Sequence, residues 1–194
     1  MCMKQGHLLI DLESYASNVL VLCVKTLPCV GLLKYSNGGD DRMSRGLVDS
    51  GALSRAQGCL LGQLAGDALG SLVEFCTPDE IRRKYPNGVR ELADGGAWNT
   101  IAGQPTDDSE MALLLARLLA EQRKYDPEEA KKVYIFWLNS RPFDCGATIA
   151  SGLRGRPNPD SQANGALMRI SPLGIFGANY DLELVAEWAR QVNR

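Results

Sequence analysis

Histidine is almost absent from this sequence. The chain of 194 residues holds a single histidine, His7, which lies near the N-terminus and far from every motif described below. A serine or cysteine nucleophile usually needs a neighbouring histidine as its base, so this lack argues against that class of hydrolase. If the protein is an enzyme, we expect carboxylates or a bound metal to do the acid–base work.

Paired cysteines and a secretory signal are also lacking. None of the six cysteines has the C-x-x-C spacing of a common zinc site. Scattered cysteines without a signal peptide are typical of reduced thiols, so we expect a cytoplasmic location. The longest apolar run near the start, Val19 to Val24, is too short to cross a bilayer, and Asp11 and Glu13 precede it where a signal peptide needs positive charge.

No charge of one sign dominates the chain. The 21 Lys and Arg residues nearly balance the 23 Asp and Glu residues, which leaves a net charge of -2. A nucleic-acid partner is therefore not expected, and the short apolar runs give no reason to expect a membrane partner.

The chain divides into an arm and a helical domain. Residues 1–53 follow no clear hydrophobic period and are predicted to form an N-terminal arm or extension. Ser54 with Gln57 resembles a capping box, which predicts that a helix begins there. No β-alternation of useful length follows, so residues 54–194 predict an all-α domain.

Later helices are marked by acidic caps. Asp126, followed by a proline, predicts one helix start, and Tyr134 and Trp137 on that helix are expected to be core aromatics. Asp144 and Asp181 are predicted to cap two further helices.

A row of glycines marks the first predicted helix. Gly58, Gly62, Gly66 and Gly70 recur every four residues and so share one face, which ends at Glu74. Each glycine costs a helix about 1 kcal/mol relative to alanine, so we expect another helix or a ligand to approach this face closely. Glu74 is a candidate catalytic carboxylate; alternatively, it is a solvated residue at a frayed helix end.

Oxygen-bearing side chains gather at the start of a second predicted helix. Thr106, Asp107, Asp108 and Glu110 directly precede apolar residues with helical spacing. Oxygen ligands of this kind suit a hard cation such as Mg²⁺. Alternatively, Asp107 and Glu110 form only a capping box.

A third motif is the polar turn that contains Ser161, Asn164 and Gly165. A small-residue turn that enters a helix leaves free backbone N–H groups, which suit a phosphate. The alternative is an ordinary Asn-Gly turn.

In this order, the three motifs resemble those of the ADP-ribosylglycohydrolases, and in particular the bacterial dinitrogenase reductase-activating glycohydrolase group. The resemblance covers about residues 54–194. It implies an ADP-ribosylglycohydrolase-like helical bundle with a magnesium-dependent site. The implied activity is removal of ADP-ribose from a modified protein or from a small ADP-ribose-containing molecule.

The resemblance also implies roles for single residues. Thr106, Asp107 and Asp108 match the metal-binding threonine and aspartates of the family, and Glu74 matches a carboxylate that assists hydrolysis. The loop that cradles ADP-ribose is matched by three residues: Ser161, Asn164 and Gly165.

One family feature is missing. The family completes its metal site from a later Asp-x-Asp segment, and no such segment follows residue 165. The chain therefore resembles an N-terminal portion of the family, and two hypotheses stand. One is a magnesium-dependent hydrolase. The other is an inactive fragment that binds ADP-ribose or a partner, with exposed apolar helix faces that favour self-association.

Overall fold

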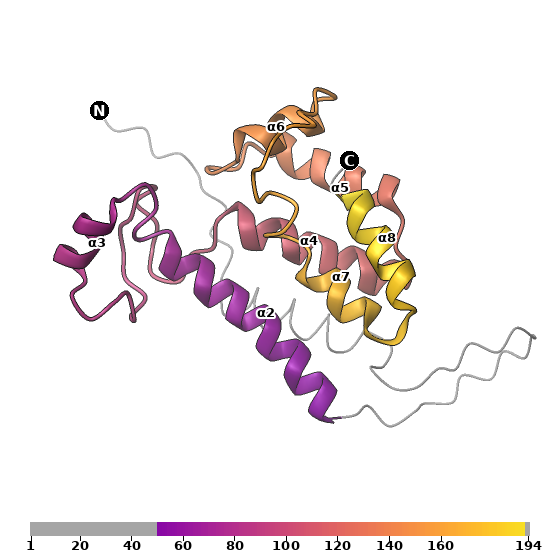
Figure 1. Ribbon diagram of the computed structural model, residues 1–194, viewed down its shortest axis with the longest axis horizontal. Coiled ribbons are helices and arrows are strands. Elements are labelled where there is room, and N and C mark those ends of the chain that lie inside the picture. Colours follow the sequence, from indigo (N-terminus) through magenta and orange to yellow (C-terminus); the bar gives the residue numbers. More distant parts are fainter. Residues whose placement is uncertain (1–49, 193–194) are drawn as a thin grey trace, which may run out of the picture.

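The computed structural model describes residues 50–192, and helices are the main elements of this range (Figure 1). In chain order they are α2 (Ser50–Gly70), α3 (Pro78–Lys84), α4 (Asp107–Gln122), α5 (Pro127–Asn139), α6 (Ala147–Leu153), α7 (Ser171–Phe176), the 3₁₀ helix η1 (Gly177–Asn179) and α8 (Leu182–Val192). An isolated bridge joins Gly95 to Thr100. The predicted all-α fold is confirmed, while the first 49 residues of the predicted arm lie outside the described range.

Helix α4 is the centre of the bundle. It packs against α2, α5 and α7, and α8 closes over α5 and α7 (Figure 1). Met111 and Leu115 on α4 are both 0% exposed, which is typical of a helix covered by neighbours on several sides. Among residues 50–192, no helix is long and apolar enough to span a membrane.

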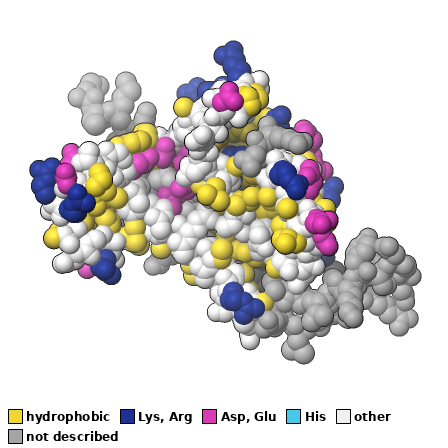
Figure 2. All heavy atoms as spheres, viewed as in Figure 1, with side chains coloured by type: hydrophobic (Ala, Val, Ile, Leu, Met, Phe, Trp, Pro, Cys, Tyr) yellow, Lys and Arg dark blue, Asp and Glu magenta, His cyan; other side chains and the backbone are white. Residues whose placement is uncertain are grey.

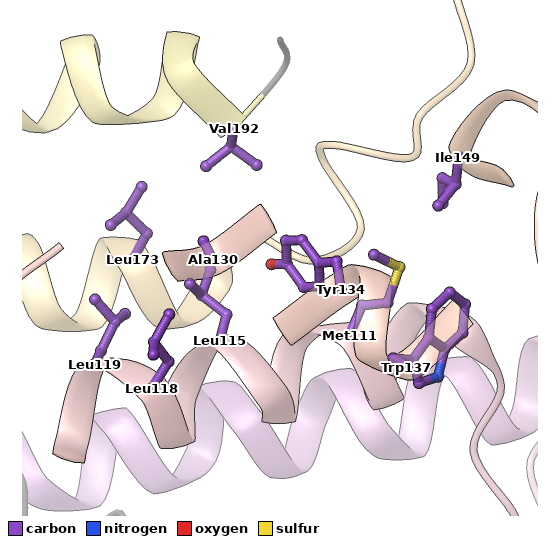
Figure 3. Close-up of a cluster of buried hydrophobic side chains, with 10 residues drawn as sticks. All are labelled: Met111, Leu115, Leu118, Leu119, Ala130, Tyr134, Trp137, Ile149, Leu173 and Val192. Carbon is purple, nitrogen blue, oxygen red and sulfur yellow. The ribbon is translucent and has the colours of Figure 1, made fainter. Parts of the chain in front are cut away.

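The hydrophobic core gathers side chains from five helices, as Figure 3 shows. Tyr134 and Trp137 belong to it with 4% and 5% exposure, so the prediction that they are core aromatics is confirmed. The buried members of this cluster are Met111, Leu115, Leu118, Leu119, Ala130, Tyr134, Trp137, Ile149, Leu173 and Val192.

Two helix starts follow the predicted local chemistry. The Asp126 carboxylate accepts hydrogen bonds from the backbone N–H groups of Glu128 and Glu129, which caps α5. Asp181 accepts from the backbone N–H of Glu183 at 2.8 Å at the start of α8. Both caps satisfy amides that have no partner inside the helix.

Helix α2 differs from its prediction at both ends. Ser50 is already helical, so the predicted start at Ser54 is wrong, and Ser54 lies inside the helix. The helix ends at Gly70, which leaves Glu74 in the turn that follows rather than on the helix.

The glycine row of α2 makes no close contact with another described helix, although Gly66 and Gly70 line a cavity that is described below. All four glycines are exposed, and a methyl group added to any of them would meet no atom within 4 Å. The expected close helix contact is therefore not made in the part of the chain that the structure describes. The bundle receives another row of small and apolar residues instead: Ala52, Ala56, Leu60 and Ala68.

Candidate functional site

A cavity of about 660 Å³ lies beside the first turn of α4. Its walls come from the end of α2, the turn beyond it, the start of α4, the segment that enters α6 and the turn before α7. Six of the seven residues to which the family resemblance gives roles line this one cavity: Glu74, Thr106, Asp107, Asp108, Asn164 and Gly165. Segments far apart in the sequence therefore meet at one place.

The seventh residue, Ser161, lies to one side. It lines a neighbouring cavity of about 440 Å³. Its hydroxyl oxygen accepts a hydrogen bond from the backbone N–H of Ala163 at 3.2 Å and lies 3.3 Å from the Thr148 hydroxyl. Ser161 thus shapes the turn that precedes Asn164.

Asp67 on α2 holds the first turn of α4. Its carboxylate accepts hydrogen bonds from the Thr106 N–H at 2.9 Å, the Thr106 hydroxyl at 2.6 Å and the Ser109 N–H at 3.2 Å. Thr106 occupies the N-cap position but makes no side-chain cap bond of its own. A carboxylate from another helix therefore satisfies amides that a local cap would usually serve, and it lies where the helix dipole favours negative charge.

The capping-box alternative for this helix start is not what the structure shows. Glu110 accepts a hydrogen bond from the Trp137 indole at 2.7 Å, and this bond ties α4 to α5. Asp107 accepts from the Gly146 N–H at 3.0 Å, and this bond ties α4 to the start of α6. The acidic residues at the start of α4 thus bind neighbouring segments.

Asp144 does not cap α6, and that prediction is wrong. The N-cap of α6 is Gly146, whose N–H is already taken by Asp107. Asp144 instead adds its carboxylate to the wall of the large cavity.

Carboxylates crowd this cavity. Burial, reinforced by the charges of Asp67, Asp107 and Glu74, raises the pKa of Asp108 to about 6. Burial, with Asp107, Glu74 and other acids adding to it, raises the pKa of Asp144 to about 7. No lysine or arginine is among the described residues that line the cavity. Figure 2 shows acidic side chains gathered on this face near the junction of α2 and α4.

The donor chemistry fits a hard cation in part. A hydroxyl and carboxylates are the ligands that Mg²⁺ prefers, and a cation would relieve the repulsion among the carboxylates that, after burial, raises the pKa of Asp108. Within residues 50–192, however, no three His, Cys, Asp or Glu side chains are grouped so that they could hold a metal ion. Thr106, Asp107 and Asp108 could therefore supply only part of a coordination sphere.

The segment around Asn164 and Gly165 is a turn, as predicted, but it does not lead directly into a helix. The Met168 N–H donates to the Asn164 carbonyl at 3.0 Å, and the next helix, α7, begins only at Ser171. A methyl group on Gly165 would lie 2.8 Å from Cγ1 of Ile149. Glycine at this position lets the turn lie directly against α6.

Gln63 on α2 connects this turn to the acidic helix start. Its side-chain amide donates to the carbonyl of Asp108 at 3.1 Å and to the carbonyl of Met168 at 2.6 Å. The Ser171 hydroxyl donates to the Gln63 side-chain oxygen. No spacing in the sequence marks Gln63, because its partners lie 45 to 108 residues away.

The comparisons with known proteins agree with this geometry. The profile of the family described as ADP-ribosylglycohydrolase matches residues 49–194, which is more than half of the chain. The chain belongs to the ADP-ribosylglycohydrolase family. The resemblance seen in the sequence is thereby confirmed.

Known ADP-ribosylglycohydrolases of bacteria are similar to it. The ADP-ribosyl-[dinitrogen reductase] glycohydrolase of Rhodospirillum rubrum is 40% identical over 141 residues, which cover 66% of this chain and 47% of the relative. The ADP-ribosylarginine hydrolase Tri1 of Pseudomonas putida (strain GB-1) is 32% identical over 165 residues, covering 76% of this chain and 42% of the relative.

A solved structure supports the same fold. The ADP-ribosylglycohydrolase-related protein complex superposes with a TM-score of 0.57 at 30% sequence identity, and the match covers 72% of this chain and 49% of that chain. This ADP-ribosylglycohydrolase chain thus spans about half the length of the relatives that it matches.

Proposed function

We propose that this chain is a magnesium-dependent hydrolase that removes ADP-ribose from a modified protein side chain or a small acceptor. One observation carries the proposal: Glu74, the Thr106–Asp108 segment and the Asn164–Gly165 turn line a single cavity. The names of two relatives support the reaction class, since one is a glycohydrolase of ADP-ribosylated dinitrogen reductase and the other is an ADP-ribosylarginine hydrolase.

Thr106, Asp107 and Asp108 would hold the Mg²⁺, which would supply positive charge for orienting ribose hydroxyls and a water molecule. Two contacts prepare these ligands. Asp67 fixes the Thr106 hydroxyl at 2.6 Å, and the Gly146 N–H fixes one oxygen of Asp107 at 3.0 Å. Ligands held by such neighbours lose little freedom when an ion binds.

Glu74 is the carboxylate that we propose to accept a proton from the attacking water. The water oxygen forms a bond to C1″ of the ribose, and the bond from C1″ to the acceptor breaks. A proton then passes to the released acceptor, which leaves free ADP-ribose. The turn at Asn164 and Gly165, with Ser161 supporting it, would offer backbone and amide groups to ADP-ribose in the same cavity.

The direct test is release of ADP-ribose from ADP-ribosyl-arginine, measured with Mg²⁺ and after chelation. We expect Mg²⁺-dependent release that falls by about a hundredfold or more in Glu74→Gln, because general-base catalysis contributes about 10² to 10⁴ in rate. Asp107→Asn should also lower release, because it removes the charge of a proposed Mg²⁺ ligand. Asp79→Asn, an exposed change on α3, is the matched control and should keep its rate. The proposal is wrong if the rate of ADP-ribose release changes neither on chelation of Mg²⁺ nor in Glu74→Gln.

A second candidate function is a non-catalytic module that binds ADP-ribose or a partner. Two observations favour it: the chain spans about half the length of its relatives, and its described residues offer no complete cluster of metal-binding side chains. Calorimetry with ADP-ribose separates the two functions. Binding without turnover, under conditions where the Rhodospirillum rubrum relative is active, supports the module; absence of both binding and turnover rejects each candidate.

A further inference from the structure

Trp98 lies on a structured loop between α3 and α4. Gly95 and Thr100 exchange backbone hydrogen bonds of 2.8 and 2.9 Å, which closes the loop on either side of Trp98. The carboxylate of Asp94 accepts from the Ala102 N–H at 2.8 Å. These bonds hold the indole at the tip of a closed loop.

Gly96 docks this loop against the turn that follows α2. Its φ is +74°, and a Cβ there would lie 2.3 Å from the carbonyl oxygen of Ser71 and 3.1 Å from Cα of Leu72. The neighbouring atoms belong to backbone, so only glycine permits this approach. The contact places Trp98 beside the turn that carries Glu74.

The indole of Trp98 holds the Glu74 carboxylate. Its N–H donates to Oε2 of Glu74 at 2.8 Å. The Phe75 and Phe143 rings meet the indole edge-on, with centroids at 6.4 and 6.3 Å, and so fix its plane from two neighbouring segments. Phe75 has a φ of +61° and is 79% exposed, a strained and costly placement for an aromatic residue unless it has a use.

We propose that Trp98 is a positioning residue for hydrolysis, which orients Glu74 through its indole N–H. The inference rests on the proposed function of Glu74. The bond to Oε2 makes Oε1 the more basic oxygen, and we expect Oε1 to take the proton from water. A side chain in a turn has many rotamers, and the indole selects one of them before the substrate arrives.

The kinetic test compares Trp98→Phe with Trp188→Phe in the complete chain. The first variant keeps the ring and its edge contacts but removes the N–H; the second makes the same change on α8, in another aromatic cluster. We expect Trp98→Phe to lower kcat by about tenfold to a hundredfold with little change in KM, as expected for a displaced catalytic group. Trp188→Phe should keep the kcat of the unmodified chain.

A double-mutant cycle with Glu74→Ala distinguishes positioning from a general structural effect. If Trp98 acts through Glu74, adding Trp98→Phe to Glu74→Ala lowers kcat no further. Losses that multiply fully in the double variant, or an unchanged kcat in Trp98→Phe alone, overturn the inference.

A second measurement decides the inference even if the chain has no turnover. The sequence has three tryptophans, so ¹⁵N-labelled protein gives three indole N–H signals, which the two tryptophan variants assign. We expect Glu74→Ala to shift the Trp98 signal and to speed its exchange with solvent, while the Trp188 signal stays in place. An unmoved Trp98 signal would overturn the inference, whereas a missing turnover with a shifted signal counts against the proposed function alone.

Discussion

Asp67 is the residue on which the acidic helix start depends. It serves two backbone amides and one hydroxyl at the first turn of α4, all of them from another helix. Removing it leaves these groups without their acceptor in a partly buried place, and losing such a helix cap costs about 0.5 to 2 kcal/mol in total.

We therefore predict that Asp67→Ala lowers the free energy of unfolding by about 2 kcal/mol, in line with the loss of a helix cap together with its charge. Urea unfolding followed by circular dichroism measures this change. Asp79→Asn on the exposed surface of α3 is the control and should change stability by less than about 0.5 kcal/mol. Equal effects of the two variants would contradict the role given to Asp67.

Asp144 predicts a pH dependence of stability. Burial and neighbouring carboxylates raise its pKa from an ordinary 3.8 to about 7 in the folded chain. Between these values the folded chain binds more protons than the unfolded chain, so its contribution to stability is present at low pH and is lost as pH rises. We expect the urea midpoint to decline between about pH 4 and pH 7, and to decline less steeply in Asp144→Asn. If the urea midpoint falls equally with pH in the unmodified chain and in Asp144→Asn, Asp144 is not the source of the pH dependence.

At the residue scale, the sequence predicts side chains whose chemistry is local and misses those whose partners are distant. Thr106, Asp107 and Asp108 form one dense polar run, so they could be singled out. Asp67 and Trp98 reach partners 39 and 24 residues away, and no spacing within a motif reports such contacts. The prediction that Asp144 caps α6 failed because its position just before the helix resembles a cap, and the sequence does not show the cavity that this residue lines.

At the scale of elements, the sequence again predicts features that depend on local contacts and misses those that depend on distant ones. Helices α5 and α8 begin as predicted because Asp126 and Asp181 bond to amides two or three residues ahead. The start of α2 was missed because its helical pattern extends four residues beyond the apparent cap at Ser54. Helices α4 and α7 determine which face of α2 is buried. The spacing of glycines within α2 does not predict that face.

Two glycine substitutions test this description of α2 and the Trp98 loop. Gly58→Ala adds a methyl group that meets no atom within 4 Å, so we expect it to stabilise the fold by about 0.5 to 1 kcal/mol through helix propensity. Gly96→Ala forces a side chain into backbone at positive φ, so we expect it to destabilise the fold by about 1 to 3 kcal/mol. Thermal unfolding of both variants, side by side, gives the two signs; a destabilising Gly58→Ala would show that another segment covers that face.

At the scale of the whole molecule, apolar surface is conspicuous. Phe136, Leu167 and Leu182 are 74%, 74% and 81% exposed. Figure 2 shows hydrophobic side chains spread across the face on which α4, α7 and α8 lie in Figure 1. Exposed apolar side chains, when they form a patch, are typical of protein interfaces.

We accordingly predict that the chain self-associates as its concentration rises, which sedimentation velocity would detect. Leu182→Ser together with Leu167→Ser should weaken this association without loss of helical signal, because both side chains are exposed. Cys59→Ser, an exposed change on α2, serves as the control for loss of a surface side chain. A monomer at every concentration would refute the prediction.

The bond between Asp67 and the first turn of α4 also provides a way to observe the site without substrate. The Thr106 and Ser109 amides are held by a side chain of α2, not by their own helix. Their hydrogen exchange with deuterated solvent therefore reports how often α2 and α4 separate at this point, in a protein that is otherwise folded. We expect any ligand that needs the two helices together to slow the exchange of these two amides.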